Sequence, residues 1–170
     1  MNSFVAKFGY GYNYKALFAP LPDIELIFDR TQEDVDRVKL LNQKYQNGTI
    51  TEVELAEWNG NLKGALNKSD LTRILFYMNY FAENLSIALT PQTLPEIPRE
   101  SWYETLHDNL ELLRSNYSTH ETTPEVPDNP FNTYQKWNDI EKILYDLYDI
   151  YSNQNIYYCG DELYGNNILI

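Results

Sequence analysis

The chain has 170 residues, of which 43% are hydrophobic and 22% are charged, and its formal net charge at pH 7 is −12. This composition is typical of a globular protein and argues against extensive disorder. The excess of acidic residues argues against a nucleic-acid partner, because nucleic-acid phosphates bind Lys and Arg. No apolar run is long enough for a membrane span. A lone cysteine excludes a disulfide framework and a cysteine-based zinc site.

The first residues differ in charge and pattern from the rest. Residues 1–22, the N-terminal arm, contain two lysines and no acidic residue. Aromatic and small residues alternate from Phe8 to Tyr14, and this period of two is typical of a β-strand. A short strand is also expected at residues 24–28. We therefore assign residues 1–28 to an aromatic arm followed by a short strand.

Residues 29–90 form the expected helical module. Thr31 is followed by acidic residues, which favour a helix start, and apolar residues then recur at helical spacing until Asn47. Thr51 and Glu54 fit a capping box that opens a short second helix. Ser69 is expected to cap a third helix, whose apolar stripe is the most continuous in the chain. That stripe consists of Leu71, Ile74, Leu75, Met78, Phe81, Ala82, Leu85 and Leu89.

Residues 91–130 contain six of the eight prolines, in two clusters that mark connections, because proline breaks helix interiors. Between the clusters, a helix of about three turns is expected from the apolar spacing. Its apolar residues are Trp102, Leu106, Leu110 and Leu113. The second connection, residues 118–130, is polar and is expected to be mobile.

Residues 131–170 are predicted to form a long helix followed by a strand or hairpin tail. Apolar residues from Trp137 to Tyr151 make a stripe wide enough for burial on two sides, and residues 156–159 have a strand-like composition. The last three residues, Ile168, Leu169 and Ile170, must be covered by the chain itself or by a partner. The predicted fold is therefore mainly α, with about five helices in a small bundle-like domain and short β-strands from both ends.

A short pattern recurs three times: Asp, apolar, any residue, basic, apolar. It begins at Asp34, Asp70 and Asp139. An Asp in a first helical turn complements the helix dipole, and the basic residue three positions later can pair with it. Two interpretations stay open: helix starts resemble one another, or a helical unit was duplicated.

Residues that could support catalysis are few, and no enzyme activity is predicted. The single Glu-x-x-His pair, Glu104 and His107, falls short of a di-iron site, which needs two such pairs. No phosphate-binding loop or dinucleotide fingerprint is present. Glu57 or Glu104 could serve as one of two carboxylates in a cell-wall hydrolase, although solvated acidic helix faces are the commoner reading. Cys159, among aromatic residues, is expected to be an inert packed thiol. We expect no metal and no cofactor.

Three groups of residues resemble a recurring module. They are residues 29–38, which read DRTQEDVDRV, the Glu57-Trp58 pair, and residues 62–73, which read LKGALNKSDLTR. The stretches 137–144 and 158–165 resemble the closing part of the same proteins. The resemblance touches residues 29–85 and 134–165, and it is to small proteins and tail-protein segments of phages and prophages of low-GC Gram-positive bacteria. The N-terminal arm lies outside it.

The resemblance implies a minor structural protein of the virion, assembled in the cytoplasm of the bacterial host and associated with the tail, baseplate or fibre. Its expected partners are other virion proteins, and self-association is a further possibility. A host-surface or carbohydrate-binding tail module is the alternative, followed by a muralytic enzyme or a cytoplasmic phage regulator. The expected contact residues lie at the two ends of the chain, since aromatic residues are enriched at interfaces. They are Phe8, Tyr10, Tyr12, Tyr14, Phe18, Ile168, Leu169 and Ile170.

Overall fold

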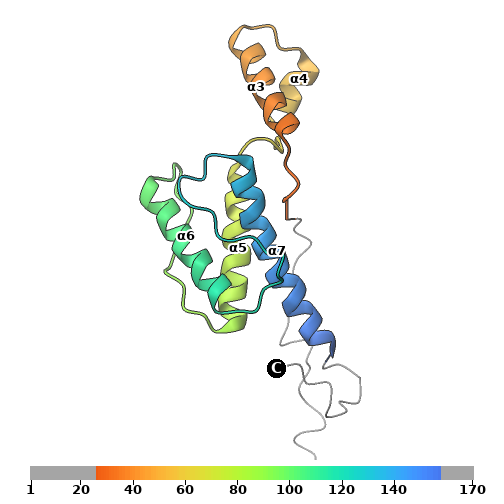
Figure 1. Ribbon diagram of the computed structural model, residues 1–170. Helices are drawn as coiled ribbons and strands as arrows, with labels where there is room; N and C mark the ends of the chain where they lie inside the picture. Colours follow the sequence, from red (N-terminus) through yellow and green to blue (C-terminus); the bar gives the residue numbers. More distant parts are fainter. Residues whose placement is uncertain (1–25, 158–170) are drawn as a thin grey trace, which may run out of the picture.

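The computed structural model describes residues 26–157, which contain five α-helices and no strand (Figure 1). The prediction of a mainly helical chain is confirmed. In chain order the helices are α3 (Gln32–Gln46), α4 (Glu52–Trp58), α5 (Lys68–Leu85), α6 (Glu100–Ser115) and α7 (Tyr134–Tyr157).

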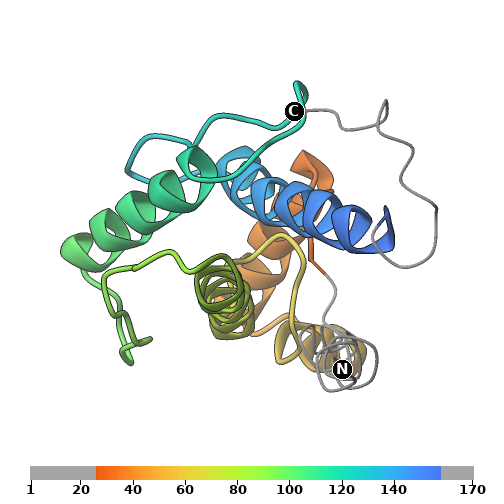
Figure 2. The same cartoon turned by 90° about the horizontal axis from the view of Figure 1, so that it is seen from below.

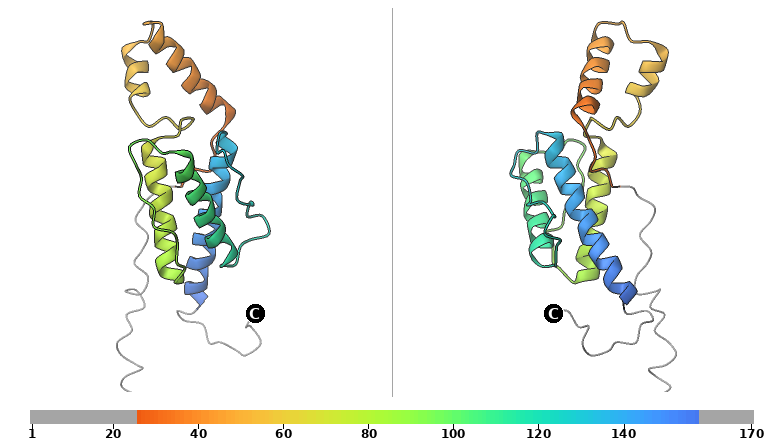
Figure 3. Two further views of the ribbon diagram at one scale, coloured as in Figure 1. Left: turned by 90° about the vertical axis from the view of Figure 1, so that its left-hand side faces the viewer. Right: turned by 45° about the vertical axis from the view of Figure 1, so that its right-hand side comes forward.

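The helices form two parts. α5, α6 and α7 pack against one another as a three-helix body, and α3 packs on α4 as a hairpin. The α3–α4 hairpin projects beyond one end of the three-helix body, as Figures 1 and 3 show. Seen from below in Figure 2, α5 is viewed end-on while α6 and α7 run obliquely beside it.

One hydrophobic core lies inside the three-helix body. The apolar stripe of α5 faces the inner residues of α6 and α7, as the sequence predicts. The fully buried members are Ile74, Met78, Phe81, Leu106, Leu110, Leu113, Ile140, Ile143, Leu144 and Leu147. The α3–α4 hairpin buries only Leu41 among its own helical residues. Most of the hydrophobic stabilisation therefore comes from the body.

Two predicted helix starts are confirmed by reciprocal capping boxes. Thr31 and Asp34 cap α3, and Thr51 and Glu54 cap α4. The predicted cap at Ser69 is wrong, because the N-cap is Asn67 and α5 begins at Lys68, two residues earlier than a cap at Ser69 would place it. There the Asp70 carboxylate accepts a hydrogen bond from the Asn67 backbone N–H at 2.8 Å. An acid at the third helical position selects the residue three before it as the cap.

The strand predictions are not supported in the part of the chain that the structure covers. Leu26, Ile27 and Phe28 have no regular secondary structure, and Ile156 and Tyr157 belong to α7. A four-residue apolar run cannot distinguish strand from helix, and no proline or glycine interrupts α7 before its end. The other residues of the predicted strands lie outside the described residues.

The connection between α6 and α7 packs on the body, although its polar composition predicts a mobile segment. Thr123 and Val126 are buried. The Thr123 hydroxyl donates to the buried Asp146 carboxylate of α7 at 2.8 Å, and the Arg114 side chain donates to the Pro124 carbonyl at 2.8 Å. These hydrogen bonds satisfy the buried polar groups and tie the segment to α6 and α7.

Candidate functional site

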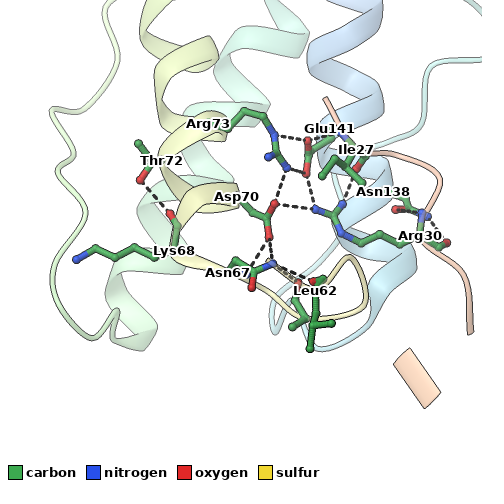
Figure 4. Close-up of polar contacts among 11 residues, drawn as sticks. Ile27, Arg30, Leu62, Asn67, Lys68, Asp70, Thr72, Arg73, Asn138 and Glu141 are labelled. Atoms are coloured by element: carbon green, nitrogen blue, oxygen red, sulfur yellow. Dashed lines mark hydrogen bonds and ion pairs between the residues drawn. The ribbon is translucent and has the colours of Figure 1, made fainter. Parts of the chain in front are cut away.

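A buried network of charges joins the N-terminal residues of the described chain to the three-helix body. It consists of Arg30, Asp70, Arg73 and Glu141, drawn in Figure 4. Arg30 precedes α3, Asp70 and Arg73 lie in the first turns of α5, and Glu141 lies in α7. The network therefore holds three separate parts of the chain at the base of the α3–α4 hairpin.

Glu141 is the centre of the network and its side chain is fully buried. Its Oε1 accepts from Arg30 Nη2 at 2.7 Å and from Arg73 Nη2 at 2.8 Å. Its Oε2 accepts from Arg73 Nε at 3.0 Å and from the Ile27 backbone N–H at 2.7 Å. Both oxygens thus have two donors, as a buried carboxylate requires.

Asp70 closes the network on the side of α5. Its Oδ1 lies 2.6 Å from Arg73 Nη2 and 3.4 Å from Arg30 Nη2, while its Oδ2 accepts from the Asn67 backbone. One carboxylate therefore caps its own helix and neutralises two guanidinium groups. With two arginines and two carboxylates, the cluster has no net charge.

Arg30 and Asn138 also clamp the backbone before α3. Arg30 Nη1 donates to the Ile27 carbonyl. The Asn138 side-chain oxygen accepts from the Arg30 N–H at 3.1 Å, and its amide donates to the Arg30 carbonyl at 2.9 Å. These bonds fix the segment without a strand partner, so the path of the chain into α3 is set by side chains of α7.

Gly64 lets the α4–α5 connection approach the start of α3. A Cβ atom at this position would lie 2.2 Å from the Asp34 carbonyl carbon and oxygen and 2.6 Å from the Val35 nitrogen. Only glycine fits such an approach of two backbones. The α3–α4 hairpin is therefore held at its base by both of its ends.

Ion pairing within the network stabilises the charged form of Arg73. Burial by itself would lower the pKa of Arg73, but its bonds to Glu141 and Asp70 raise that pKa above the ordinary value. Each carboxylate of the network contacts two guanidinium groups, so the four side chains hold one another in place.

A groove of about 600 Å³ borders the network between residues 26–29 and the first turns of α5. Lys63 and Asp29 line it and form an ion pair at 2.8 Å. Two further hollows, of about 540 and 470 Å³, share Phe131 and Trp137 on the side of α7 near its start. Three hollows thus lie around the base of the hairpin and the start of α7.

The eight contact residues predicted at the chain ends lie outside the described residues, and so does Cys159. They are Phe8, Tyr10, Tyr12, Tyr14, Phe18, Ile168, Leu169 and Ile170. The sequence does not predict the network, although the recurring Asp–basic pattern includes Asp70 and Arg73. A buried Glu or Arg leaves no local signal when its partners are more than 60 residues away.

The two carboxylates considered for hydrolysis differ in their surroundings. Glu57 accepts two hydrogen bonds from Arg37, at 2.9 and 2.6 Å, and this pairing lowers the pKa of Glu57 below its ordinary value. That direction is opposite to what a general acid requires. Glu104 is exposed on α6. Within residues 26–157 no group of three or more His, Cys, Asp or Glu could hold a metal ion.

Only one of the three repeated Asp–basic pairs forms the expected contact three residues apart. This is Asp70–Arg73. Arg37 binds Glu57 instead of Asp34, and Lys142 binds Asp146 instead of Asp139. Burial raises the pKa of Asp139. The copies at Asp34 and Asp70 lie in the first turns of α3 and α5, the copy at Asp139 lies one turn inside α7, and tertiary contacts decide how each basic residue pairs.

No helix in the described part of the chain is both long and apolar enough to cross a bilayer. Comparison of the chain with protein-family models, with curated proteins and with solved structures finds no match in any of the three.

Proposed function

We propose that the protein is a non-enzymatic structural adaptor of a phage particle, associated with the tail or baseplate. The observation that carries the proposal is the fixed base of the α3–α4 hairpin. The hairpin projects from the body, and four buried charged side chains hold its base. Such a hairpin is suited to present a surface at a constant angle to neighbouring proteins. An adaptor needs this property, since it joins components of fixed geometry.

The assignment to a phage particle comes from the resemblance of residues 29–85 and 134–165 to phage and prophage tail proteins. All four residues of the network fall in the segments that carry this resemblance. The resembling module is therefore the part of the chain that sets the hairpin on its body. The chain ends, with their aromatic and aliphatic residues, supply further contacts in this proposal.

A direct test is quantitative mass spectrometry of purified particles of the phage or induced prophage that encodes the chain. The proposal expects the protein at a low and constant ratio to the major tail protein. Its absence from particles, together with abundant protein in the host cytoplasm, would contradict the proposal and favour a phage regulator.

A carbohydrate-binding tail module is the second candidate, and one observation favours it. The Tyr45 and Trp58 rings stack at 5.9 Å on the hairpin, and Tyr45 is 53% exposed. Exposed aromatic rings offer apolar faces to partners that also have polar edges. Saturable binding of the purified protein to host cell walls, lost in Tyr45→Ser and kept in Leu40→Ser, would favour this candidate over the adaptor.

A further inference from the structure

Tyrosines of α5 and α7 lie partly in the core and partly at its edge: Tyr77 is buried, whereas Tyr80, Tyr145 and Tyr148 are partly or largely exposed. Tyr77 and Tyr80 lie three residues apart on α5, and Tyr145 and Tyr148 lie three residues apart on α7, so each pair shares one helix face. α5 and α7 pack against each other. We call these four tyrosines the α5–α7 seam.

The contacts show that the two pairs meet. Tyr148 lies close enough to Tyr77 and Tyr80 to add to the rise that burial causes in the pKa of both. Tyr80 also meets Tyr151 edge-on, with ring centroids 6.5 Å apart. Phe76 and Tyr145 form exposed rims, at 37% and 41% exposure. Because Tyr77 is only 4% exposed, the accessible part of the seam consists of Tyr80, Tyr145 and Tyr148, with Phe76 beside them.

The described residues before α3 contact one end of this seam. The Phe28 ring packs on Tyr145 with centroids 4.9 Å apart, and Lys142 lies over both rings. Leu26 packs against the core, and the Ile27 N–H is bound by Glu141. The residues before Leu26 are therefore tethered at one end of the seam.

Charge and length both favour these preceding residues as the occupant. The N-terminal arm has two lysines and no acid, whereas residues 26–157 have 11 basic and 21 acidic residues. Twenty-five residues can reach about 80 Å, and α5, with 18 residues, is about 27 Å long. A tethered segment also has a high effective concentration at a nearby site.

We infer that the α5–α7 seam is the binding site for the aromatic N-terminal arm of the same chain. The chemistry is aromatic packing on the accessible parts of Tyr80, Tyr145 and Tyr148, supported by attraction between the arm lysines and the acidic body. The inference does not depend on the assignment to a phage particle, but it gives the N-terminal arm a site on its own chain in place of a contact with another particle protein.

Photo-crosslinking in the full-length protein tests the inference. Benzoylphenylalanine replaces Phe76 or Tyr145 at the rims, and in matched controls it replaces Val53 or Ile97, which are 79% and 78% exposed on other surfaces. Circular dichroism verifies that each variant is folded. The crosslinked peptides are identified by mass spectrometry in the monomer fraction.

The expected result is crosslinking of the rim positions to residues 1–22, at least tenfold above both controls and independent of protein concentration. Replacing both Lys7 and Lys15 with Glu should lower that yield severalfold. Rim positions that crosslink no more to the arm than the controls do would overturn the inference. Crosslinks between two chains, rising with concentration, would also overturn it and assign the seam to a second copy.

Discussion

At the scale of single residues, the stability of the hairpin base depends on Glu141. Its carboxylate binds two arginines and one backbone N–H, and its side chain is fully buried. Buried charges are strongly disfavoured unless they are paired and hydrogen-bonded. The network therefore tolerates the loss of one member poorly, although its complete replacement by apolar residues can be neutral.

Glu141→Gln should lower the free energy of unfolding by about 3–5 kcal/mol, because it leaves Arg30 and Arg73 buried without their shared counter-charge. Urea unfolding followed by circular dichroism measures this change. The matched control is Glu125→Gln, which also removes a carboxylate from an arginine. The Glu125 side chain is 85% exposed, so its loss should change stability by less than about 1 kcal/mol. Equal losses of unfolding free energy in the two variants would show that burial does not decide the cost of losing the carboxylate.

At the scale of helices, the α3–α4 hairpin relies on polar contacts more than on its core. Lys44 of α3 binds Glu54 of α4, and Arg37 of α3 binds Glu57 of α4. Tyr45 and Trp58 add a stacked ring contact between the same two helices. Since exposed ion pairs contribute little each, we expect the hairpin to be less stable than the body and sensitive to pH.

The pH dependence of the hairpin should come in part from Glu54. The hydrogen bond from Lys44, followed by the bond from the Thr51 backbone, lowers the pKa of Glu54 from 4.5 to about 2. A carboxyl with a lowered folded-state pKa stabilises the fold above the unfolded value. The contribution is therefore present above pH 4.5 and is lost as the pH falls from 4.5 through 2.

Hydrogen exchange of the α4 amides between pH 5 and pH 2, corrected for intrinsic rates, measures this loss of stability. Glu54→Gln should make the stability of α4 less dependent on pH over this range. Glu52→Gln is the matched control, since it removes a carboxylate from the same turn and leaves the bonds of Lys44 and Thr51 in place. If both variants keep the wild-type slope, Glu54 is not its source.

The close approach of the α4–α5 connection to α3 makes Gly64 a second sensitive position at this scale. Gly64→Ala should destabilise the protein by roughly 1–3 kcal/mol, because its Cβ would overlap the Asp34 backbone at 2.2 Å. Gly60→Ala, whose nearest contact would be the Glu57 carbonyl at 3.2 Å, is the control and should lose less. Urea midpoints compare the two, and a larger loss in Gly60→Ala would refute the packing account.

At the scale of the whole molecule, the network decides how the α3–α4 hairpin sits on the three-helix body. The hairpin shares little buried apolar surface with α5, α6 and α7. Its direction therefore depends on the bonds of Arg30 and Asn138 and on the fit at Gly64. Removing one of these contacts should let the hairpin change its direction relative to the body, while the body stays folded.

Arg30→Gln should broaden the distribution of distances between the hairpin and the body. Spin labels at Val53→Cys and Ile97→Cys, in a Cys159→Ser background, report this distance by pulsed electron resonance. Both label sites are highly exposed. The control Arg37→Gln removes an arginine whose ion pair lies within the hairpin, so the width should stay as in wild type. An unchanged width in Arg30→Gln would show that the network does not set the angle.

The sequence by itself determined the helices, because their signals are local. Thr31 with Asp34 and Thr51 with Glu54 act within one turn, and the apolar stripe of α5 is readable from its spacing. The same locality explains the errors. The strand-like run at Ile156 and Tyr157 is too short to decide between strand and helix, and the capping role of Asn67 depends on which residue Asp70 reaches.

Only the tertiary structure decided which charges meet. Arg30 and Glu141 are 111 residues apart, and Arg73 and Glu141 are 68 apart, so no spacing along the chain relates them. The polar residues 118–130 pack on the body, where the Thr123 hydroxyl donates a hydrogen bond to Asp146 of α7. Buried ion pairs form where packing excludes water and brings opposite charges together, and that requires the helices to be in place first.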